Sequence, residues 1–314
     1  TDPSAYSEDR TKGTNAIRQY LGNLKNAGSL YGRIIYNKAP IMMRQLENLL
    51  GETQFKEGIQ EYIQTYANGN ADWSELVGIL DNKTTGDIKS WSDVWVNSPG
   101  RPIFTEEVEL NEKGNVTKFV IHQKAEDGSQ KIWIQSFKIQ LKDERGYEKT
   151  INLKNMGNSF DISSAVKDFK PGQVLYNTNG FGYGVFPVYK EKLSSYKDIN
   201  DEVSRGSQFI NLYENMLNGV VTPLESYAVL FDAMLVEENE LILNYLTGRV
   251  QTIYWSFFTK EQQYAEQQKT ESQLFTLLKK ELPKNIKKTL FTLYQSTAIS
   301  EKGKENLYAI WSKN

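Results

Sequence analysis

The spacing of apolar residues changes character twice along this chain of 314 residues. Before about residue 100 and after about residue 200, apolar residues recur every three or four positions, which is the spacing of a helix with one buried face. Between these stretches, short runs of β-branched and aromatic residues alternate with Gly, Asn and Asp, a pattern typical of strands joined by turns. We therefore predict a multidomain α+β protein divided at residues 1–102, 103–195 and 196–314.

The first region is expected to be helical from residue 14 to about residue 100. Gly51 follows an apolar stripe of helical spacing, and a glycine in this place commonly ends a helix. Asp72 with Glu75 three residues later predicts a helix that begins with a capping box. The segment 97–102, with two prolines and a glycine, breaks the helical pattern and marks a boundary.

The middle region contains about seven short runs at the spacing expected of a small antiparallel β-sandwich. Two segments between them, 109–115 and 126–129, are predicted to be hairpin loops. The glycine-rich segment Gly180–Gly184 lacks the following helix and lysine of a phosphate-binding loop, so we interpret it as a tight bend between strands. The runs predicted as strands include 116–123, 132–141, 147–153, 174–177 and 183–188.

The last region again shows apolar stripes of helical spacing, separated by small breaks. Thr222 and Pro223 form the pattern of a helix N-cap followed by a first-turn proline. Successive short antiparallel helices predict an α-helical superhelix of the α-solenoid kind. The sequence shows no strict repeat, so membership of a regular repeat family is not supported.

Histidine and cysteine content excludes several kinds of catalytic site. The chain has no cysteine, which excludes disulfides, thiol nucleophiles and cysteine-ligated metals. It has one histidine, His122, whereas an H-E-x-x-H zinc site needs two on one helix face. We therefore expect no metal ligand and no cofactor in this chain, and we expect His122 to be a strand residue that faces solvent or is half-buried.

Charge and hydropathy restrict the partners. The formal net charge is -2, and such a balanced chain gives no indication of nucleic-acid binding. No stretch approaches the roughly 18 apolar residues of a membrane-spanning helix. We expect a soluble protein of the cytoplasm or of the periplasm or exterior. The chain starts at Thr1 without a signal-peptide pattern, so we expect it to be part of a longer protein.

A series of motifs resembles the aminopeptidase N family of zinc metallopeptidases. The stretch Tyr36-Asn37-Lys38-Ala39-Pro40, followed by Leu50-Gly51-Glu52 and Phe55, resembles that family's Y-x-K-G-A and L-G-E-x-x-F motifs. Further segments resemble later parts of the family in the same order. They are Asp72–Leu76, Trp91 and Trp95 with Ser98–Pro102, Val174–Tyr183, Ser204-Arg205 and Pro223–Glu237.

The resemblance implies a particular domain order. The chain would begin with the helical end of a thermolysin-like catalytic domain, continue through the β-sandwich and enter the helical superhelix. In the family, the zinc ligands and the general-base glutamate lie upstream of the tyrosine stretch. The resemblance therefore implies zinc in the parent protein and an inactive chain when it is alone. Its implied partners are peptide substrates and the missing N-terminal and catalytic domains.

The resemblance also assigns two site residues. Tyr36 matches the family's catalytic tyrosine, whose hydroxyl would bind the oxyanion while zinc holds the other side. Tyr31 is a candidate for the second tyrosine that some members carry nearby. The family's Gly-Ala is Ala39-Pro40 here, and both residues suit a helix start.

Two other interpretations remain open from the sequence. The concave face of a helical array can hold a peptide or a partner protein, so the chain could be a non-enzymatic binding module. Alternatively it is a scaffold, in which Leu46, Phe55 and Trp95 matter only for stability.

Overall fold

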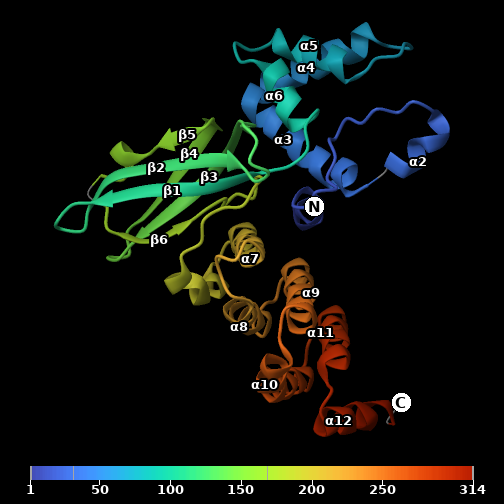
Figure 1. The fold of residues 1–314 in the computed structure, drawn as a ribbon, viewed down its shortest axis with the longest axis vertical. Coiled ribbons are helices and arrows are strands. Elements are labelled where there is room, and N and C mark those ends of the chain that lie inside the picture. Colours follow the sequence, from blue (N-terminus) through green and yellow to red (C-terminus); the bar gives the residue numbers. More distant parts are fainter. Residues whose placement is uncertain (1, 31, 168, 313–314) are drawn as a thin grey trace. The chain divides into compact units, whose positions relative to one another are not determined.

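The computed structural model describes residues 2–30, 32–167 and 169–312. The chain divides into a first unit, Thr1–Pro187, and a second unit, Val188–Asn314. Each is described here by itself (Figure 1). The first unit contains both helices and strands, and the second is helical, so the mixed composition with a helical C-terminal region is as predicted. The division into three domains stays a prediction.

Local signals determine the helices that precede the first strand. Gly51 ends one helix with a positive φ of 88°. Asp72 accepts a hydrogen bond from the backbone N–H of Ser74 at 2.7 Å, and Glu75 completes the predicted capping box. The helices are α1 (Asp2–Asp9), α2 (Ala27–Leu30), α3 (Ala39–Leu50), α4 (Glu52–Thr65), α5 (Trp73–Asp81) and α6 (Ile88–Trp95), with short helical turns η1 (Leu24–Asn26) and η2 (Ile34–Lys38).

The helical prediction was wrong at the beginning of the chain. Helix α1 was not predicted, although Pro3 occupies its first turn. Residues 14–23 were predicted to be helical and contain no helix. Arg18 explains the difference, because its backbone N–H donates to the carbonyl of Val96 at 2.9 Å and its guanidinium pairs with Asp72. Contacts with residues far along the chain therefore override the local pattern.

The strands form two antiparallel sheets. One has the order β1 (Pro102–Leu110), β2 (Val116–Ala125), β5 (Ser159–Asp161), and the other β4 (Glu148–Met156), β3 (Gln135–Asp143), β6 (Pro171–Leu175). The rings of Phe104 and Phe137, one from each sheet, lie 5.3 Å apart, and both pack on Phe186. An apolar core thus lies between the two sheets.

The loops between strands were predicted with mixed success. The predicted segment 109–115 contains a hairpin loop at 111–115, because β1 and β2 pair as antiparallel neighbours. Segment 126–129 is not a hairpin loop, because β2 and β3 belong to different sheets. After this turn, Trp133 exchanges two hydrogen bonds with the Gln123 amide. This buried contact fixes the connection that passes from β2 in one sheet to β3 in the other.

The run 183–188 was predicted to be a strand and is not one. Only Val185 forms an isolated bridge, with Ile103. The reason is Gly184, which has a φ of 145° and whose hypothetical Cβ would lie 2.7 Å from the carbonyl oxygen of Pro102. The glycine-rich segment is therefore a tight, closely packed bend, but it follows β6 and does not lie between two strands as predicted. The described residues form six strands, and about seven were expected.

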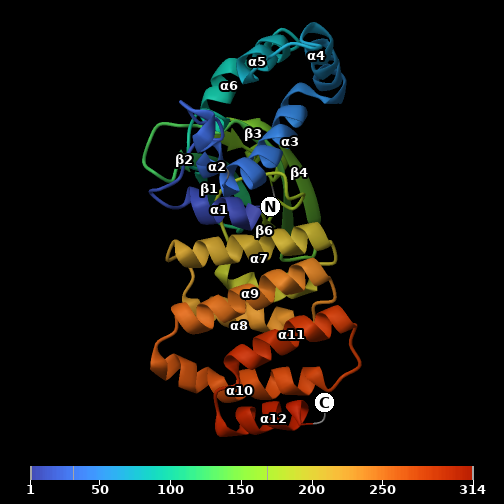
Figure 2. The ribbon, with the colours of Figure 1, turned by 90° about the vertical axis from the view of Figure 1, so that its right-hand side faces the viewer.

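The second unit is built from helices with local caps. Thr222 accepts from the backbone N–H of Glu225, and Pro223 lies in the first turn, as predicted. Helix α8 packs on α9, α9 on α11, and α11 on α10, and Figure 2 shows these four helices in layers between α7 and α12. The elements are η4 (Lys190–Asp198), α7 (Glu202–Leu217), α8 (Pro223–Met234), α9 (Glu240–Ser256), α10 (Lys260–Leu278), α11 (Lys284–Thr297) and α12 (Glu301–Trp311).

Across residues 2–30, 32–167 and 169–312, each helix is too short or too polar to span a bilayer.

Candidate functional site

Tyr36 lies in η2, a π-helical turn directly before α3. Its backbone N–H donates to the carbonyl of Gly32 at 3.2 Å. The N–H of Ala39 reaches back to the carbonyl of Ile34, five positions earlier, which is the π-helical pattern. The side chain of Tyr36 is 63% exposed. Tyr31, the second predicted site residue, lies outside the described residues.

Lys38, two positions after Tyr36, is buried in the interior of the first unit. Its Nζ atom lies 2.7 Å from Oδ2 of Asp9, and both side chains are fully buried. The ammonium also donates to the carbonyl oxygen of Gly100 at 2.6 Å. Lys38 therefore links three segments that are distant in sequence: the tyrosine turn, helix α1 and the segment 97–102.

The Asp9 carboxylate collects hydrogen bonds from four residues. Oδ2 accepts from Lys38 and from the Tyr183 hydroxyl, the latter at 2.8 Å. Oδ1 accepts from the Thr14 hydroxyl at 2.6 Å and from the Gly100 N–H at 3.2 Å. We call Asp9, Thr14, Lys38, Gly100 and Tyr183 the Asp9 cluster. The hydrogen bonds of this cluster offset the desolvation cost of burying the Asp9 carboxylate.

Electrostatics in the cluster follow from its burial. Burial lowers the pKa of Lys38 below its usual value, while the Asp9 carboxylate opposes that change. Burial, together with the charge of Asp9, raises the pKa of Tyr183 well above its usual value. The Tyr183 hydroxyl therefore keeps its proton and remains a hydrogen-bond donor to Asp9.

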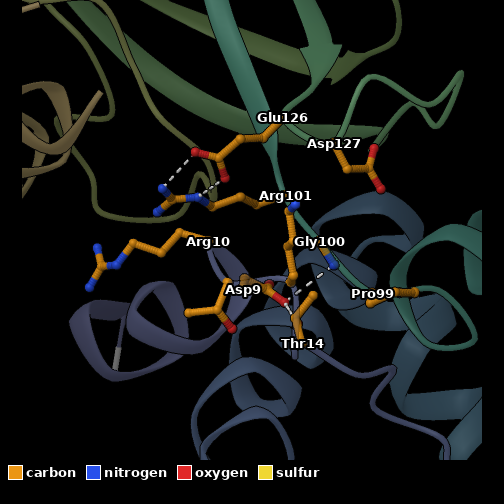
Figure 3. A pocket seen from close by; sticks show the side chains of 10 residues that line it. Asp9, Arg10, Thr14, Pro99, Gly100, Arg101, Glu126 and Asp127 are labelled. Atoms are coloured by element: carbon orange, nitrogen blue, oxygen red, sulfur yellow. Dashed lines mark hydrogen bonds and ion pairs between the residues drawn. The ribbon is translucent and has the colours of Figure 1, made fainter. Parts of the chain in front are cut away.

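A hollow of about 480 Å³ lies beside the cluster. Figure 3 shows Asp9 next to Gly100 on one side of it and the Arg101 guanidinium next to the Glu126 carboxylate on the other. Arg101 and Glu126 form a two-pronged ion pair of 2.7 and 3.0 Å, and the guanidinium also lies over the Tyr6 ring. These paired charges give the hollow no preference for one ligand charge, and we assign it no ligand.

A second set of polar contacts joins the helices of the first unit to its sheets. The Gln45 amide donates to the carbonyls of Ser136 and Phe181, at 3.0 and 2.6 Å, and accepts from the Ser136 N–H. The indoles of Trp91 and Trp95 both donate to the carbonyl of Ile134 at 3.0 Å. Helices and sheets of this unit are therefore joined through specific hydrogen bonds.

His122 lies in β2, and its side chain is 42% exposed. Its Nε2 atom is 3.5 Å from a Glu107 carboxylate oxygen. The prediction of a strand residue that faces solvent or is half-buried is confirmed. Within the part of the chain that the structure describes, no group of three or more His, Asp or Glu side chains could hold a metal ion.

The sequence proposes Tyr36 as a site residue but does not reveal the residues buried next to its turn. Lys38 was quoted only as part of a motif, and Asp9 and Tyr183 were not singled out. One signal was available, since Ile34, Lys38 and Met42 lie four positions apart, on one helix face. Ile34 and Met42 are buried with Lys38. A lysine on an apolar helix face predicts a buried acidic partner.

Comparisons with known proteins cover the tyrosine turn and more. Residues 2–95 match the model of the peptidase family M1 domain. Aminopeptidase N of Streptomyces lividans is 31% identical over 121 residues, covering 38% of this chain and 14% of that protein. Probable aminopeptidase 1 of Sulfurisphaera tokodaii is 22% identical, covering 83% and 32%. Tricorn protease-interacting factor F2 of Thermoplasma acidophilum is 21% identical, covering 80% and 30%.

These matches place the chain among the metallopeptidases, the class that the tyrosine segment indicates. More narrowly, residues 2–95 match the M1 peptidase family, and the relatives include an aminopeptidase N and a probable aminopeptidase 1, in agreement with the family that the motif order resembles. It spans between 14% and 32% of the length of the three relatives.

Proposed function

We propose that this chain is part of a zinc-dependent metalloaminopeptidase, which hydrolyses N-terminal residues from peptides, and that Tyr36 is its oxyanion donor. The observation that supports this is the position of Tyr36. Its exposed phenol stands on a π-helical turn inside the segment that matches the peptidase family. Single π-helical turns occur frequently at functional sites.

Hydrolysis of a peptide bond is accelerated by a hydrogen-bond donor near the carbonyl oxygen. When a nucleophile attacks the peptide carbonyl, negative charge develops on the carbonyl oxygen, and a fixed donor stabilises that charge. A tyrosine hydroxyl can be such a donor. In this proposal, the Tyr36 hydroxyl donates to the developing oxyanion.

The residues of this chain do not fit a zinc centre of the H-E-x-x-H kind. The sequence has one histidine, and the described residues bring no three candidate ligands together. We therefore derive no step through zinc here. The proposal assigns the metal, its ligands and the remaining catalytic and N-terminal domains to residues outside this sequence, and it expects the isolated chain to be inactive.

The isolated chain provides the first test. We expect the purified 314-residue protein to carry no stoichiometric zinc by atomic emission and to release no amine from aminoacyl-anilides. Stoichiometric zinc together with turnover would contradict the proposal for this chain.

Tyr36→Phe in the whole zinc-loaded protein tests the assigned role. Losing one oxyanion donor should lower kcat by about 10²–10³-fold, with little change in KM because the donor acts in the transition state. Tyr20→Phe is the control, since the Tyr20 side chain is 93% exposed and has no assigned role. Unchanged kcat in Tyr36→Phe would show that Tyr36 is not the oxyanion donor.

A further inference from the structure

We propose that Lys38 and Tyr183 are positioning residues, which act through Asp9 to hold the η2 turn so that Tyr36 projects outward. This inference rests on the function proposed for Tyr36. It gives the sheet-containing part of the first unit a role in placing Tyr36, since Tyr183 follows the last strand of that part.

The geometry of a helical turn couples Tyr36 to Lys38. Residues two positions apart on a helix point in roughly opposite directions. Tyr36 is 63% exposed, whereas Lys38 is fully buried. Fixing the Lys38 ammonium inside the unit therefore fixes the direction in which the Tyr36 side chain leaves the same turn.

The anchor for Lys38 is itself fixed. The Asp9 carboxylate accepts from Lys38 and Tyr183 through one oxygen, and from Thr14 and Gly100 through the other. A carboxylate with every partner in place cannot rotate without breaking a buried hydrogen bond, which is costly in a low-dielectric interior. The Lys38 ammonium has a second fixed partner in the Gly100 carbonyl.

The glycine-rich bend explains how Tyr183 reaches this anchor. A Cβ on Gly182 would lie 2.7 Å from the Phe186 ring, and a Cβ on Gly184 would lie 2.7 Å from the Pro102 carbonyl oxygen. Only glycine permits such close backbone packing. The N–H of Tyr183, between the two glycines, donates to the Gln135 amide at 2.7 Å. The bend therefore delivers the Tyr183 hydroxyl to Asp9.

A label on Tyr36 separates positioning from stability. We would place 3-fluorotyrosine at position 36 in the 314-residue chain and record its ¹⁹F resonance. Lys38→Met should split the resonance or broaden it by about twofold or more, because a released turn samples several conformations. Tyr183→Phe, which removes one hydroxyl, should also split or broaden the resonance, but to a smaller extent.

The matched control is Leu80→Ala in α5. Leu80 is fully buried, so this variant weakens the first unit by creating a cavity without touching the Asp9 cluster. Its ¹⁹F resonance should equal that of the unsubstituted chain. An equal change in Leu80→Ala would overturn the proposal, because general loosening would then explain the effect.

The remaining outcomes are also decisive. An unchanged resonance in folded Lys38→Met would overturn the proposal, and if that variant does not fold, an unchanged resonance in Tyr183→Phe would do so. The catalytic role of Tyr36 is judged separately by the kcat of Tyr36→Phe. A large loss of kcat with an unmoved ¹⁹F signal rejects the positioning role alone, whereas unchanged kcat rejects the proposed function.

Discussion

The two units of this protein use buried polar groups differently. In the first unit, the Tyr183 hydroxyl and the Asp9 carboxylate meet across 174 positions of sequence. In the second unit, the ion pair of Arg205 with Glu237 spans 32 positions and joins the first turn of α7 to the segment between α8 and α9. A buried contact between the hydroxyls of Tyr227 and Thr270 in the second unit spans 43 positions. These polar groups thus connect segments far apart in sequence in the first unit, and segments closer in sequence in the second.

This difference indicates which interactions fix the segments of each unit. Burying a charge pair costs desolvation energy and gives stability only when the geometry is good, but it can favour one arrangement of segments over others. Local caps and apolar stripes instead stabilise each helix where it stands. The first unit, which carries Tyr36, is therefore the one in which we expect single polar substitutions to disturb distant segments.

Asp9→Asn should produce the largest effect on stability. It leaves the buried Lys38 ammonium without its counter-ion, and breaking a buried pair from one side typically costs about 3–5 kcal/mol. The free energy of unfolding can be measured by urea titration, with hydrogen exchange to locate the loss. Exchange should rise in α1, η2 and the 180–184 bend, and stay unchanged in α9.

A double variant sharpens this prediction. Asp9→Asn combined with Lys38→Met leaves no buried charge in the cluster, so its cost should be smaller than the sum of the two single costs. Simple additivity would show that the ion pair itself contributes little, and the contrast between the two units would then fail.

Sequence reasoning predicted well wherever the determining residues lie close together. Gly51 ends α3, the Asp72 capping box begins α5, and Thr222 with Pro223 begins α8. Each signal acts within about four residues, so the sequence displays it directly. The alternation of strands and turns was equally visible over 103–175.

Distant contacts explain the failures. In residues 14–23, Arg18 contacts Val96 and Asp72, and the segment does not form the helix that its apolar pattern predicts. Segment 126–129 crosses between sheets, and 183–188 is bent by its approach to Pro102. None of these partners is adjacent in sequence, so no local pattern can reveal them.

The candidate site shows the same division. The sequence could propose Tyr36 because its motif is contiguous, whereas Asp9 and Tyr183 converge on Lys38 only after folding. The scaffold interpretation is sharpened as well. Leu46 and Trp95 are fully buried, but Phe55 is only half-buried, so its truncation should cost less than theirs.

The pH dependence of the second unit should depend on Glu237. Burial raises the pKa of this carboxyl, but hydrogen bonds from Arg205 and from the Asn239 N–H outweigh burial and lower it below the usual value. A carboxyl with a lowered pKa in the folded state stabilises the fold above its unfolded pKa of about 4.3. That contribution disappears as the pH falls through the lower, folded value.

Glu237→Gln tests this dependence. At pH 7 it should cost about 2 kcal/mol, the usual range for a hydrogen bond to a charged group. Below pH 4 the difference in free energy of unfolding between the variant and the unsubstituted chain should shrink. Urea titration measures this difference, and hydrogen exchange in α7 and α8 locates it. A difference that is the same at pH 3 and pH 7 would exclude Glu237 as the titrating group.

Thr222→Ala should have the smallest effect and the most local one. The substitution removes the side chain that caps α8, and loss of such a cap typically costs about 1 kcal/mol. Thr222→Ser keeps the hydroxyl and is the matched control, with a cost near zero. Because the cap acts within one turn, faster exchange should be confined to the first turn of α8.

If exchange also rose throughout α9 and α11, the second unit would transmit a local change as widely as we expect of the Asp9 cluster. The contrast between long-range and local polar contacts would then not separate the two units.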